Sequence, residues 1–205
     1  MVCEGTGLLI TDATATHFSS LNWTTTGTGT FDNGSTISPT YYPGTEDVTN
    51  GSVVLTLTVN SQLPCSGTAV DSKIVTVTPM PVVSAGPDDV SCGAAPYSIV
   101  GASASAFASV QWTTSGTGVF TNANMVNSTY NPSAADILSG SVTLTLTANS
   151  SAPCLVNPSD AMILSLQPEA TVNAGEDATV CATDSYTVFD ATATHYSAVN
   201  WTSNG

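Results

Sequence analysis

Apolar residues recur at every second position over short stretches along the chain. In VVLTLTVN, residues 53–60, apolar side chains share one face of an extended backbone, and residues 141–149, SVTLTLTAN, repeat the pattern. A period of two is typical of a strand with one buried face. No helical periodicity of useful length interrupts this pattern. Apolar pairs two residues apart predict further strands at Leu8/Ile10, Leu21/Trp23, Val75/Val77, Tyr97/Ile99, Val110/Trp112, Leu164/Leu166, Tyr186/Val188 and Val199/Trp201.

The predicted strands fall into units that repeat every 89 residues, the spacing of Trp23, Trp112 and Trp201. The same interval separates Cys3/Cys92/Cys181, Cys65/Cys154, Tyr41/Tyr130, Asp47/Asp136 and Asp71/Asp160. A register kept without insertion or deletion indicates a tandem array. We therefore predict three parts. Residues 1–80 form a unit that lacks its first strand, residues 81–169 form a complete unit, and residues 170–205 form the N-terminal fragment of a third unit.

Each unit offers about seven short strands joined by connectors rich in Gly, Pro, Asn and Asp, which is typical of an immunoglobulin-like β-sandwich. The predicted fold is therefore all-β, a head-to-tail array of such sandwiches. Trp23, Trp112 and Trp201 lie on alternating apolar faces, which favours positions in the core over a role as sugar-stacking platforms. A Gly-Thr-Gly follows the first two of these Trp motifs. We expect it to turn the chain sharply, so that Phe31 or Phe120 returns to the core.

The charge composition excludes several classes of partner. Lys73 is the one basic residue against 15 acidic residues, and the net charge is −14. Such a surface repels phosphate backbones and anionic lipid headgroups. No apolar run approaches the roughly 18 residues that a membrane span needs. With 41% hydrophobic residues and abundant β-branched Thr, the chain is expected to fold, without a nucleic-acid partner and without membrane insertion.

The histidines argue against catalysis. His17 and His195 are the two histidines of the chain, and the equivalent position of the middle unit is Ala106. A catalytic His needs a placed nucleophile or a metal-site partner, and no motif in the sequence supplies one. We therefore predict that the protein is not an enzyme, with no catalytic residues and no cofactor.

The unit pattern resembles a known family. Its motif reads VxAGxDxxxC, WTTSGTGxF, TYxPSxxD and GSVTLTLT, followed by a late Cys, Asp and Pro. In the middle unit these residues are Val83–Cys92, Trp112–Phe120, Thr129–Asp136, Gly140–Thr147, Cys154, Asp160 and Pro168. The pattern is similar to the PKD-like repeats of large Bacteroidetes cell-surface adhesins, such as the SprB-type gliding-motility adhesins exported by the type IX secretion system. The middle unit departs from its neighbours at residues 101–106, GASASA in place of DATATH.

The resemblance implies a secreted, extracellular protein at the cell surface. Its units would be structural and adhesive spacers in a long filament, acting in surface adhesion and in gliding motility. The alternative is a carbohydrate-binding accessory module of a secreted polysaccharide-degrading enzyme, which predicts exposed aromatic residues on one unit. The expected partners are neighbouring repeats of the same chain and an extracellular surface or polysaccharide that the sequence does not identify.

Five cysteines in an acidic, strand-rich chain indicate an oxidising compartment and disulfides. One pairing lies within units, Cys3–Cys65 and Cys92–Cys154. In a sandwich, however, the loops that carry these cysteines lie at opposite poles, roughly 30 Å apart for a nine-residue strand, whereas bridged Cα atoms lie about 4.4–6.8 Å apart. In a head-to-tail array Cys3 can instead meet Cys154 of the next unit. Both pairings remain open at the level of sequence, since a bent first strand would permit the pairing within units.

Acidic residues recur near the pole that carries the late cysteine. They are Asp88 and Asp177 in the first strand of a unit, and Asp71 and Asp160 before its last strand. Carboxylates at domain junctions can hold Ca²⁺, which takes six to eight oxygen ligands. No EF-hand or nonapeptide spacing is present, so these four residues are weak calcium candidates beside the simpler interpretation of solvated loop acids and turn caps.

Overall fold

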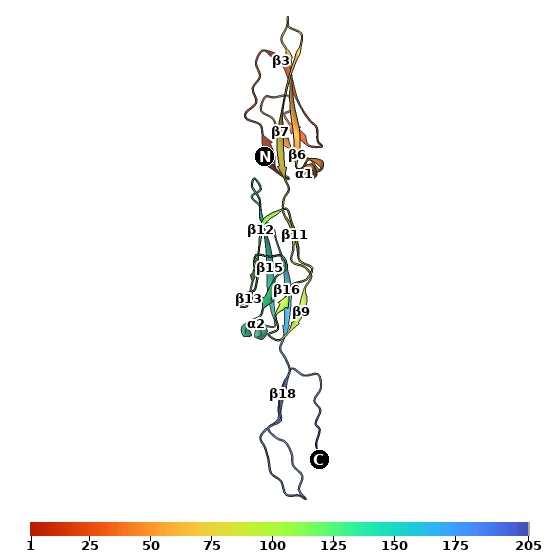
Figure 1. The fold of residues 1–205 in the computed structure, drawn as a ribbon, viewed down its shortest axis with the longest axis vertical. Coiled ribbons are helices and arrows are strands. Elements are labelled where there is room, and N and C mark those ends of the chain that lie inside the picture. The colour runs from red at the N-terminus through yellow and green to blue at the C-terminus, as the bar shows by residue number, and fades with distance from the viewer. Residues whose placement is uncertain (205) are drawn as a thin grey trace.

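The computed structural model describes residues 1–204. It consists of two β-sandwiches placed end to end and an extended C-terminal segment that continues along the same axis (Figure 1). We call the elements β1 to β7 with α1 the first sandwich, and the elements β8 to β16 with α2 the second sandwich. Residues 170–204 are the C-terminal segment. Among the described residues, no helix is long and apolar enough to cross a membrane.

The first sandwich packs two sheets over one core. One sheet has the order β1-β7-β6-β3 and the other has the order β2-β5-β4. The elements are β1 (Val2–Cys3), β2 (Leu8–Leu9), β3 (Phe18–Thr25), β4 (Thr30–Asp32), β5 (Thr40–Tyr42), α1 (Thr45–Asn50), β6 (Ser52–Ser61) and β7 (Thr68–Thr78). β1 runs parallel to β7, whereas β6 pairs with both β3 and β7 in antiparallel fashion.

The second sandwich repeats these sheets, with the orders β12-β15-β16-β9 and β10-β14-β13, and adds a ribbon formed by β8 and β11. Its elements are β8 (Val82–Ser84), β9 (Asp89–Cys92), β10 (Tyr97–Ser98), β11 (Ser103–Ser105), β12 (Phe107–Thr114), β13 (Val119–Phe120), β14 (Thr129–Asn131), α2 (Ala134–Ser139), β15 (Ser141–Ser150) and β16 (Ser159–Gln167). The sequence therefore indicated the all-β sandwich fold correctly, although several of its strands are only two or three residues long.

The alternating apolar residues form one core in each sandwich. Trp23 and Trp112 lie in these cores, and the indole N–H of each finds a backbone acceptor: Trp23 Nε1 donates to Thr36 O at 3.2 Å, and Trp112 Nε1 donates to Met125 O at 3.1 Å. Each Trp also packs near a Phe of the following strand, with ring centroids 5.9 Å apart in both sandwiches. The indole thus fills apolar volume without leaving its donor unpaired.

The C-terminal segment departs from the expected pattern. Its strands are β17 (Thr171–Asn173) and β18 (Thr192–Thr194), which pair with each other, while no strand forms around Tyr186 and Val188. Trp201, expected in a core, is 60% exposed. In the second sandwich the equivalent Trp112 pairs with Leu146 of β15. The counterpart of Leu146 in a third unit would follow Gly205, so the described residues hold no strand against which Trp201 can pack.

Two short helices, α1 and α2, were not anticipated from the sequence. Each has six residues, too few for a helical period to be recognised. α2 begins with a capping box, in which Ser133 and Asp136 each accept a hydrogen bond from the other's backbone N–H, and it ends at Gly140 with φ 76°. α1 keeps the acidic half of this arrangement, because Asp47 accepts from Gly44 N.

One backbone position with positive φ recurs in all three parts of the chain. His17, Ala106 and His195 each have a φ of 56°. A left-handed conformation costs an L-residue about 1–2 kcal/mol in the folded state. Glycine avoids this cost, but its greater conformational entropy in the unfolded state offsets part of the gain. We expect Ala106→Gly to raise the free energy of unfolding of the second sandwich by about 0.5–1 kcal/mol, measured by urea denaturation with tryptophan fluorescence. Ala161→Gly in β16, where Ala161 is exposed and pairs with Thr145, is the control and should lower it by about as much. Equal losses in both variants would contradict the prediction.

Candidate functional site

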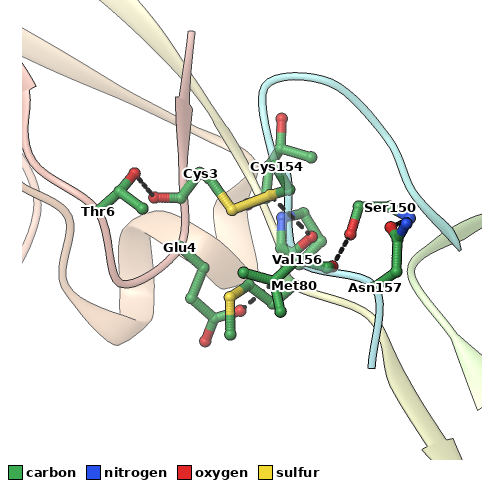
Figure 2. Close-up of a disulfide and its surroundings, with 10 residues drawn as sticks. Cys3, Glu4, Thr6, Met80, Ser150, Cys154, Val156 and Asn157 are labelled. Atoms are coloured by element: carbon green, nitrogen blue, oxygen red, sulfur yellow. Dashed lines mark hydrogen bonds between the residues drawn. A yellow bond between two sulfur atoms is a disulfide. The ribbon is translucent and has the colours of Figure 1, made fainter. Parts of the chain in front are cut away.

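The two sandwiches are joined covalently at their shared end. Cys3 at the end of β1 forms a disulfide with Cys154, which lies in the loop between β15 and β16 (Figure 2). The Cα atoms are 5.0 Å apart, and both residues are buried. Of the two pairings left open by the sequence, the structure therefore has the one between sandwiches. The pairs Cys3–Cys65 and Cys92–Cys154 do not form, because their loops lie at opposite poles of each sandwich.

Hydrogen bonds on the first sandwich hold the connecting segment against this bond. Glu4 N donates to Thr78 O at 2.9 Å, and Met80 N donates to Glu4 Oε2 at 2.9 Å. Cys154 Sγ lies 3.6 Å from Thr78 O and 3.7 Å from Pro79 O. The end of β1, the end of β7 and the connecting segment are thereby fixed to one another around the disulfide.

The loop that presents Cys154 is held by its own hydrogen bonds. Ser150 N donates to Asn157 Oδ1 at 2.9 Å, and Ser150 Oγ donates to Val156 O (Figure 2). Cys154 N donates to Ser151 O at 3.0 Å. These hydrogen bonds order the loop within the second sandwich, so the conformational entropy of the loop is lost when that sandwich folds. Cys154 is therefore already in position when it meets Cys3.

Two of the remaining cysteines, Cys92 and Cys65, lie at positions equivalent to those of Cys3 and Cys154. Cys92 pairs in register with Gln167, as Cys3 pairs with Thr78, and Gly93 N donates to Gln167 O as Glu4 N does to Thr78 O. Cys65 N donates to Gln62 O, as Cys154 N does to Ser151 O. Cys65, Cys92 and Cys181 are free and exposed.

A buried carboxylate lies in each sandwich near its helix. Asp136 is 2% exposed and accepts four hydrogen bonds: from Thr117 N at 2.8 Å, Gly118 N at 2.9 Å, Ser133 N at 2.9 Å and the Tyr130 hydroxyl at 2.8 Å. Asp47 accepts the equivalent bonds in the first sandwich from Thr28, Gly29, Gly44 and Tyr41. We call these two arrangements the Asp–Tyr centres. The repeat spacing pointed to Asp47, Asp136, Tyr41 and Tyr130 but did not assign them this role.

The Asp–Tyr centres explain the Gly-Thr-Gly motif. A Cβ on Gly27 would lie 1.6 Å from Asp47 Oδ1, and a Cβ on Gly116 would lie 2.2 Å from Asp136 Oδ1. A Cβ on Gly118 would lie 2.6 Å from the Tyr130 hydroxyl. The chain bends at residues 26–28 and 115–117, as expected for this motif, and Phe31 and Phe120 pack against the cores, but none of these glycines has a positive φ. They are needed because the carboxylate approaches the backbone too closely for any side chain.

The hydrogen bonds set the ionisation of these groups. Burial alone raises the pKa of Asp136, but the bonds from Ser133, Thr117 and Tyr130 outweigh it and lower the pKa to about 2. Burial, followed by the hydrogen bond to Asp47, raises the pKa of Tyr41 to about 12. Asp136 is therefore an anion at neutral pH whose acceptor sites are directed at donors of its own sandwich. This arrangement suits a structural anchor rather than proton transfer.

The four calcium candidates have different surroundings. Asp160 Oδ2 accepts from Ala85 N at 2.8 Å, and Asp88 Oδ1 accepts from Ile163 N at 2.7 Å, so these two side chains hold the first strand of the second sandwich against β16. Asp71 accepts from Ser72 N and is exposed, as is Asp177 in the C-terminal segment. Within residues 1–204, no group of three or more His, Cys, Asp or Glu side chains comes together that could hold a metal ion.

No protein-family model and no curated protein matches the chain. It is similar to the protocadherin GammaB4 extracellular domain, with 15% identity over 84% of this chain and 34% of that chain and a TM-score of 0.35. Human protocadherin-24 EC1-2 has 14% identity over 73% of this chain and 82% of that chain, with a TM-score of 0.39. The human desmocollin-1 ectodomain has 8% identity over 74% and 35%, with a TM-score of 0.36. The chain spans about a third of the length of the protocadherin GammaB4 and desmocollin-1 structures.

Proposed function

We propose that the chain is a structural and adhesive segment of a long secreted cell-surface filament, in which each sandwich is a spacer. The observation that carries this proposal is the Cys3–Cys154 bond, because it joins two sandwiches across a three-residue connection. A covalent bond beside a connecting peptide gives a second attachment and restricts bending at the joint. Disulfides form and persist in oxidising compartments, which supports an extracellular location.

The finer part of the proposal rests on the sequence resemblance to PKD-like repeats. It includes surface adhesion, export by the type IX system and a role in gliding motility. The partners of each spacer are its neighbouring repeats in the same chain. The filament as a whole would contact an extracellular surface or polysaccharide.

The polar groups of the sandwiches support a role without catalysis. The most deeply buried carboxylates, Asp47 and Asp136, are occupied by hydrogen bonds within their own sandwiches. The histidines, His17 and His195, are exposed and occupy a position that Ala106 fills in the second sandwich. A position that accepts Ala supplies no acid, base or ligand in that unit.

The alternative function, a carbohydrate-binding accessory module, has less support. Such a module needs exposed aromatic side chains gathered on one face. The aromatics that recur in both sandwiches, Trp23, Trp112, Tyr41 and Tyr130, are buried. In the two sandwiches Tyr42 and Phe107 are exposed, but they lie on different sandwiches at positions that are not equivalent. The C-terminal segment also exposes aromatic residues, but two of them, Tyr186 and Trp201, are the counterparts of Tyr97 and Trp112, which are core residues in the second sandwich.

Small-angle X-ray scattering tests the stiff joint. In a Cys181→Ser background, the oxidised chain should give a narrow distribution of overall dimensions with a long maximum. Cys3→Ser/Cys154→Ser should broaden this distribution and reduce the mean radius of gyration, because the connecting peptide alone then joins the sandwiches. The matched control, Cys65→Ser/Cys92→Ser, should scatter like the parent.

Identical scattering of the parent and the Cys3→Ser/Cys154→Ser variant would remove the main support for a stiff spacer.

A polysaccharide-binding assay addresses the alternative function. Saturable binding of a defined polysaccharide that is lost in Tyr42→Ala or Phe107→Ala would favour the accessory module instead.

A further inference from the structure

The outer face of the larger sheet is uncharged in both sandwiches. Along β3, β6 and β7, and along β12, β15 and β16, residues that point away from the core alternate with residues that point toward it. These six strands contain three charged residues, Asp71, Lys73 and Asp160, and all three lie on the core side of the alternation. In a protein with a net charge of −14, each sandwich therefore presents one extended face without charge.

Six outward residues of this face are identical in the two sandwiches. They are Ser20, Thr24, Ser52, Thr56, Thr58 and Asn60 in β3 and β6, and the same residues recur 89 positions later in β12 and β15. We call these six residues the hydroxyl face of each sandwich. Both hydroxyl faces belong to sheets of four strands with equivalent partners.

Other positions are exchanged between the sandwiches. The exposed residues Thr11, Thr30 and Thr49 correspond to Val100, Val119 and Leu138. Core positions change too, as from Leu21 to Val110. Strand propensity alone does not explain the identity of the hydroxyl face, because Val forms strands as readily as Thr, and the outward residue Val54 corresponds to Thr143. The retained hydroxyl groups instead point to a ligand that contacts them.

The hydroxyl groups are fixed in position but are not used within the protein. Thr56 and Thr58 are half-buried, and their β-branched side chains have few rotamers. Within residues 1–204, the side-chain hydroxyls of Thr24, Thr56 and Thr58 make no hydrogen bond. Asn60 Nδ2 donates to Ser20 Oγ at 2.8 Å, which orients the amide and leaves its Oδ1 atom as an acceptor. The equivalent pair in the second sandwich has the same bond at 2.9 Å.

The hydroxyl groups form rows along the axis of the molecule. Thr24 lies opposite Thr56 on β3 and β6, and Thr113 lies opposite Thr145 on β12 and β15. Neighbouring strands lie about 4.8 Å apart, and residues two positions apart in a strand lie about 6.6 Å apart. β6 and β15 run along the long axis of the molecule (Figure 1). Each face thus offers repeated hydroxyl groups to an elongated ligand.

The chemistry of the hydroxyl face restricts the class of ligand. A Thr hydroxyl both donates and accepts hydrogen bonds, as the hydroxyl groups of a sugar do. The net charge of −14 repels acidic polysaccharides, and it also repels a second copy of the chain. An uncharged polymer of sugars matches the face without this repulsion.

We propose that the hydroxyl face of each sandwich binds an uncharged polysaccharide. This inference rests on the proposed adhesive function and assigns that function to a surface of the repeated sandwich itself. Each hydrogen bond to an exposed hydroxyl replaces one to water, so a single face binds weakly. Faces that recur in successive sandwiches engage the same polymer together, which raises the avidity without any new kind of contact.

Affinity electrophoresis of the whole chain tests this proposal. Native gels are cast with galactomannan, mixed-linkage β-glucan or agarose as uncharged probes, and with alginate as the acidic probe. The chain should be retarded in at least one uncharged gel and should migrate in alginate as in a gel without polysaccharide. Thr56→Val/Thr145→Val removes one hydroxyl group from each face and keeps the β-branched shape. This variant should need about fivefold more polysaccharide, or a larger excess, for the same retardation.

Thr11→Val/Thr30→Val is the matched control. It removes two exposed hydroxyl groups outside the hydroxyl face and introduces the residues that the second sandwich has at these positions. The control should be retarded like the parent. Urea denaturation should show that both variants keep the stability of the parent within about 0.5 kcal/mol, so that a change in retardation reports binding.

Two results would overturn the proposal. Either no uncharged polysaccharide retards the chain, or Thr56→Val/Thr145→Val is retarded as strongly as the control. Retardation that is lost in Tyr42→Ala and kept in Thr56→Val/Thr145→Val would also reject the hydroxyl face and would support the accessory module. None of these results bears on the spacer function, because the scattering of the oxidised chain tests the stiff joint independently.

Discussion

Asp136→Ala is expected to lower the free energy of unfolding of the second sandwich by about 3–5 kcal/mol. The substitution removes one carboxylate and leaves the N–H groups of Thr117, Gly118 and Ser133 and the Tyr130 hydroxyl without their acceptor. Tyr130→Phe removes only one of these four bonds and should cost about 1 kcal/mol. Asp32→Ala, which removes an exposed carboxylate, should stay within about 0.5 kcal/mol of the parent. Urea denaturation at neutral pH measures all three.

The stability of the second sandwich at acid pH provides a second test of the Asp–Tyr centre around Asp136. The pKa of Asp136 is lowered from an ordinary value of 3.8 to about 2, so its ionised form stabilises the folded state. This contribution is fully present above the unfolded-state value and is lost as the pH falls from about 4 through about 2. It amounts to about 2 kcal/mol and should be missing from the Asp136→Ala acid profile. Acid profiles of equal slope in parent and variant would contradict an anionic anchor.

The strands were predictable because their signal is local. Alternation in residues 53–60 and 141–149 depends only on which side chains face the core, and β6 and β15 form there. Trp23 and Trp112 follow the same rule. The alternation around Trp201 is just as clear, yet that residue is exposed, because burial also needs a partner sheet. Periodicity identifies the face of a strand that can be buried but does not show what covers it.

The Asp–Tyr centres were not predictable in their role. Asp136 meets Tyr130, six residues away, and Thr117 and Gly118, which are nearly 20 residues away, through the closure of a loop onto a short helix. One signal was available: an acidic residue three positions after a helix-capping Ser, as in PSAAD, residues 132–136. The strict recurrence of Gly-Thr-Gly was visible too, but its cause, a carboxylate in contact with the backbone, appears only in three dimensions.

Geometry alone favoured one of the two cysteine pairings at the joint between the sandwiches. The length of a strand separates the two poles of a sandwich by far more than a disulfide can bridge. This argument favoured Cys3 with Cys154 but left the alternative open, because the path of β1 was not known. In the structure β1 pairs with the end of β7, which places Cys3 at the pole that faces the next sandwich.

Pulling the chain by its two ends should reveal the disulfide directly. Cys3 and Cys154 are 151 residues apart in sequence, and the intact bond prevents that segment from extending. At about 3.3–3.6 Å per residue, the segment holds about 500 Å of contour length. Optical-tweezer traces of the oxidised chain should lack this length, and traces after reduction, or of Cys3→Ser, should contain it. Cys65→Ser/Cys92→Ser should behave as the oxidised parent.

This result bears on how the chain would carry tension. With the bond intact, force passes from Cys3 to Cys154 and bypasses the core of the first sandwich. It then reaches the C-terminal segment through β16, which carries Met162, Leu164 and Leu166 of the second core. The first sandwich therefore sets length without having to resist unfolding, whereas β16 bears the load in the second sandwich. The cross-link should also raise the free energy of unfolding by about 4–5 kcal/mol through the unfolded state, by the chain-entropy account. If the oxidised chain instead released the full contour length under force, tension would pass through the sandwiches. Their stability, anchored at Asp47 and Asp136, would then limit the strength of the filament.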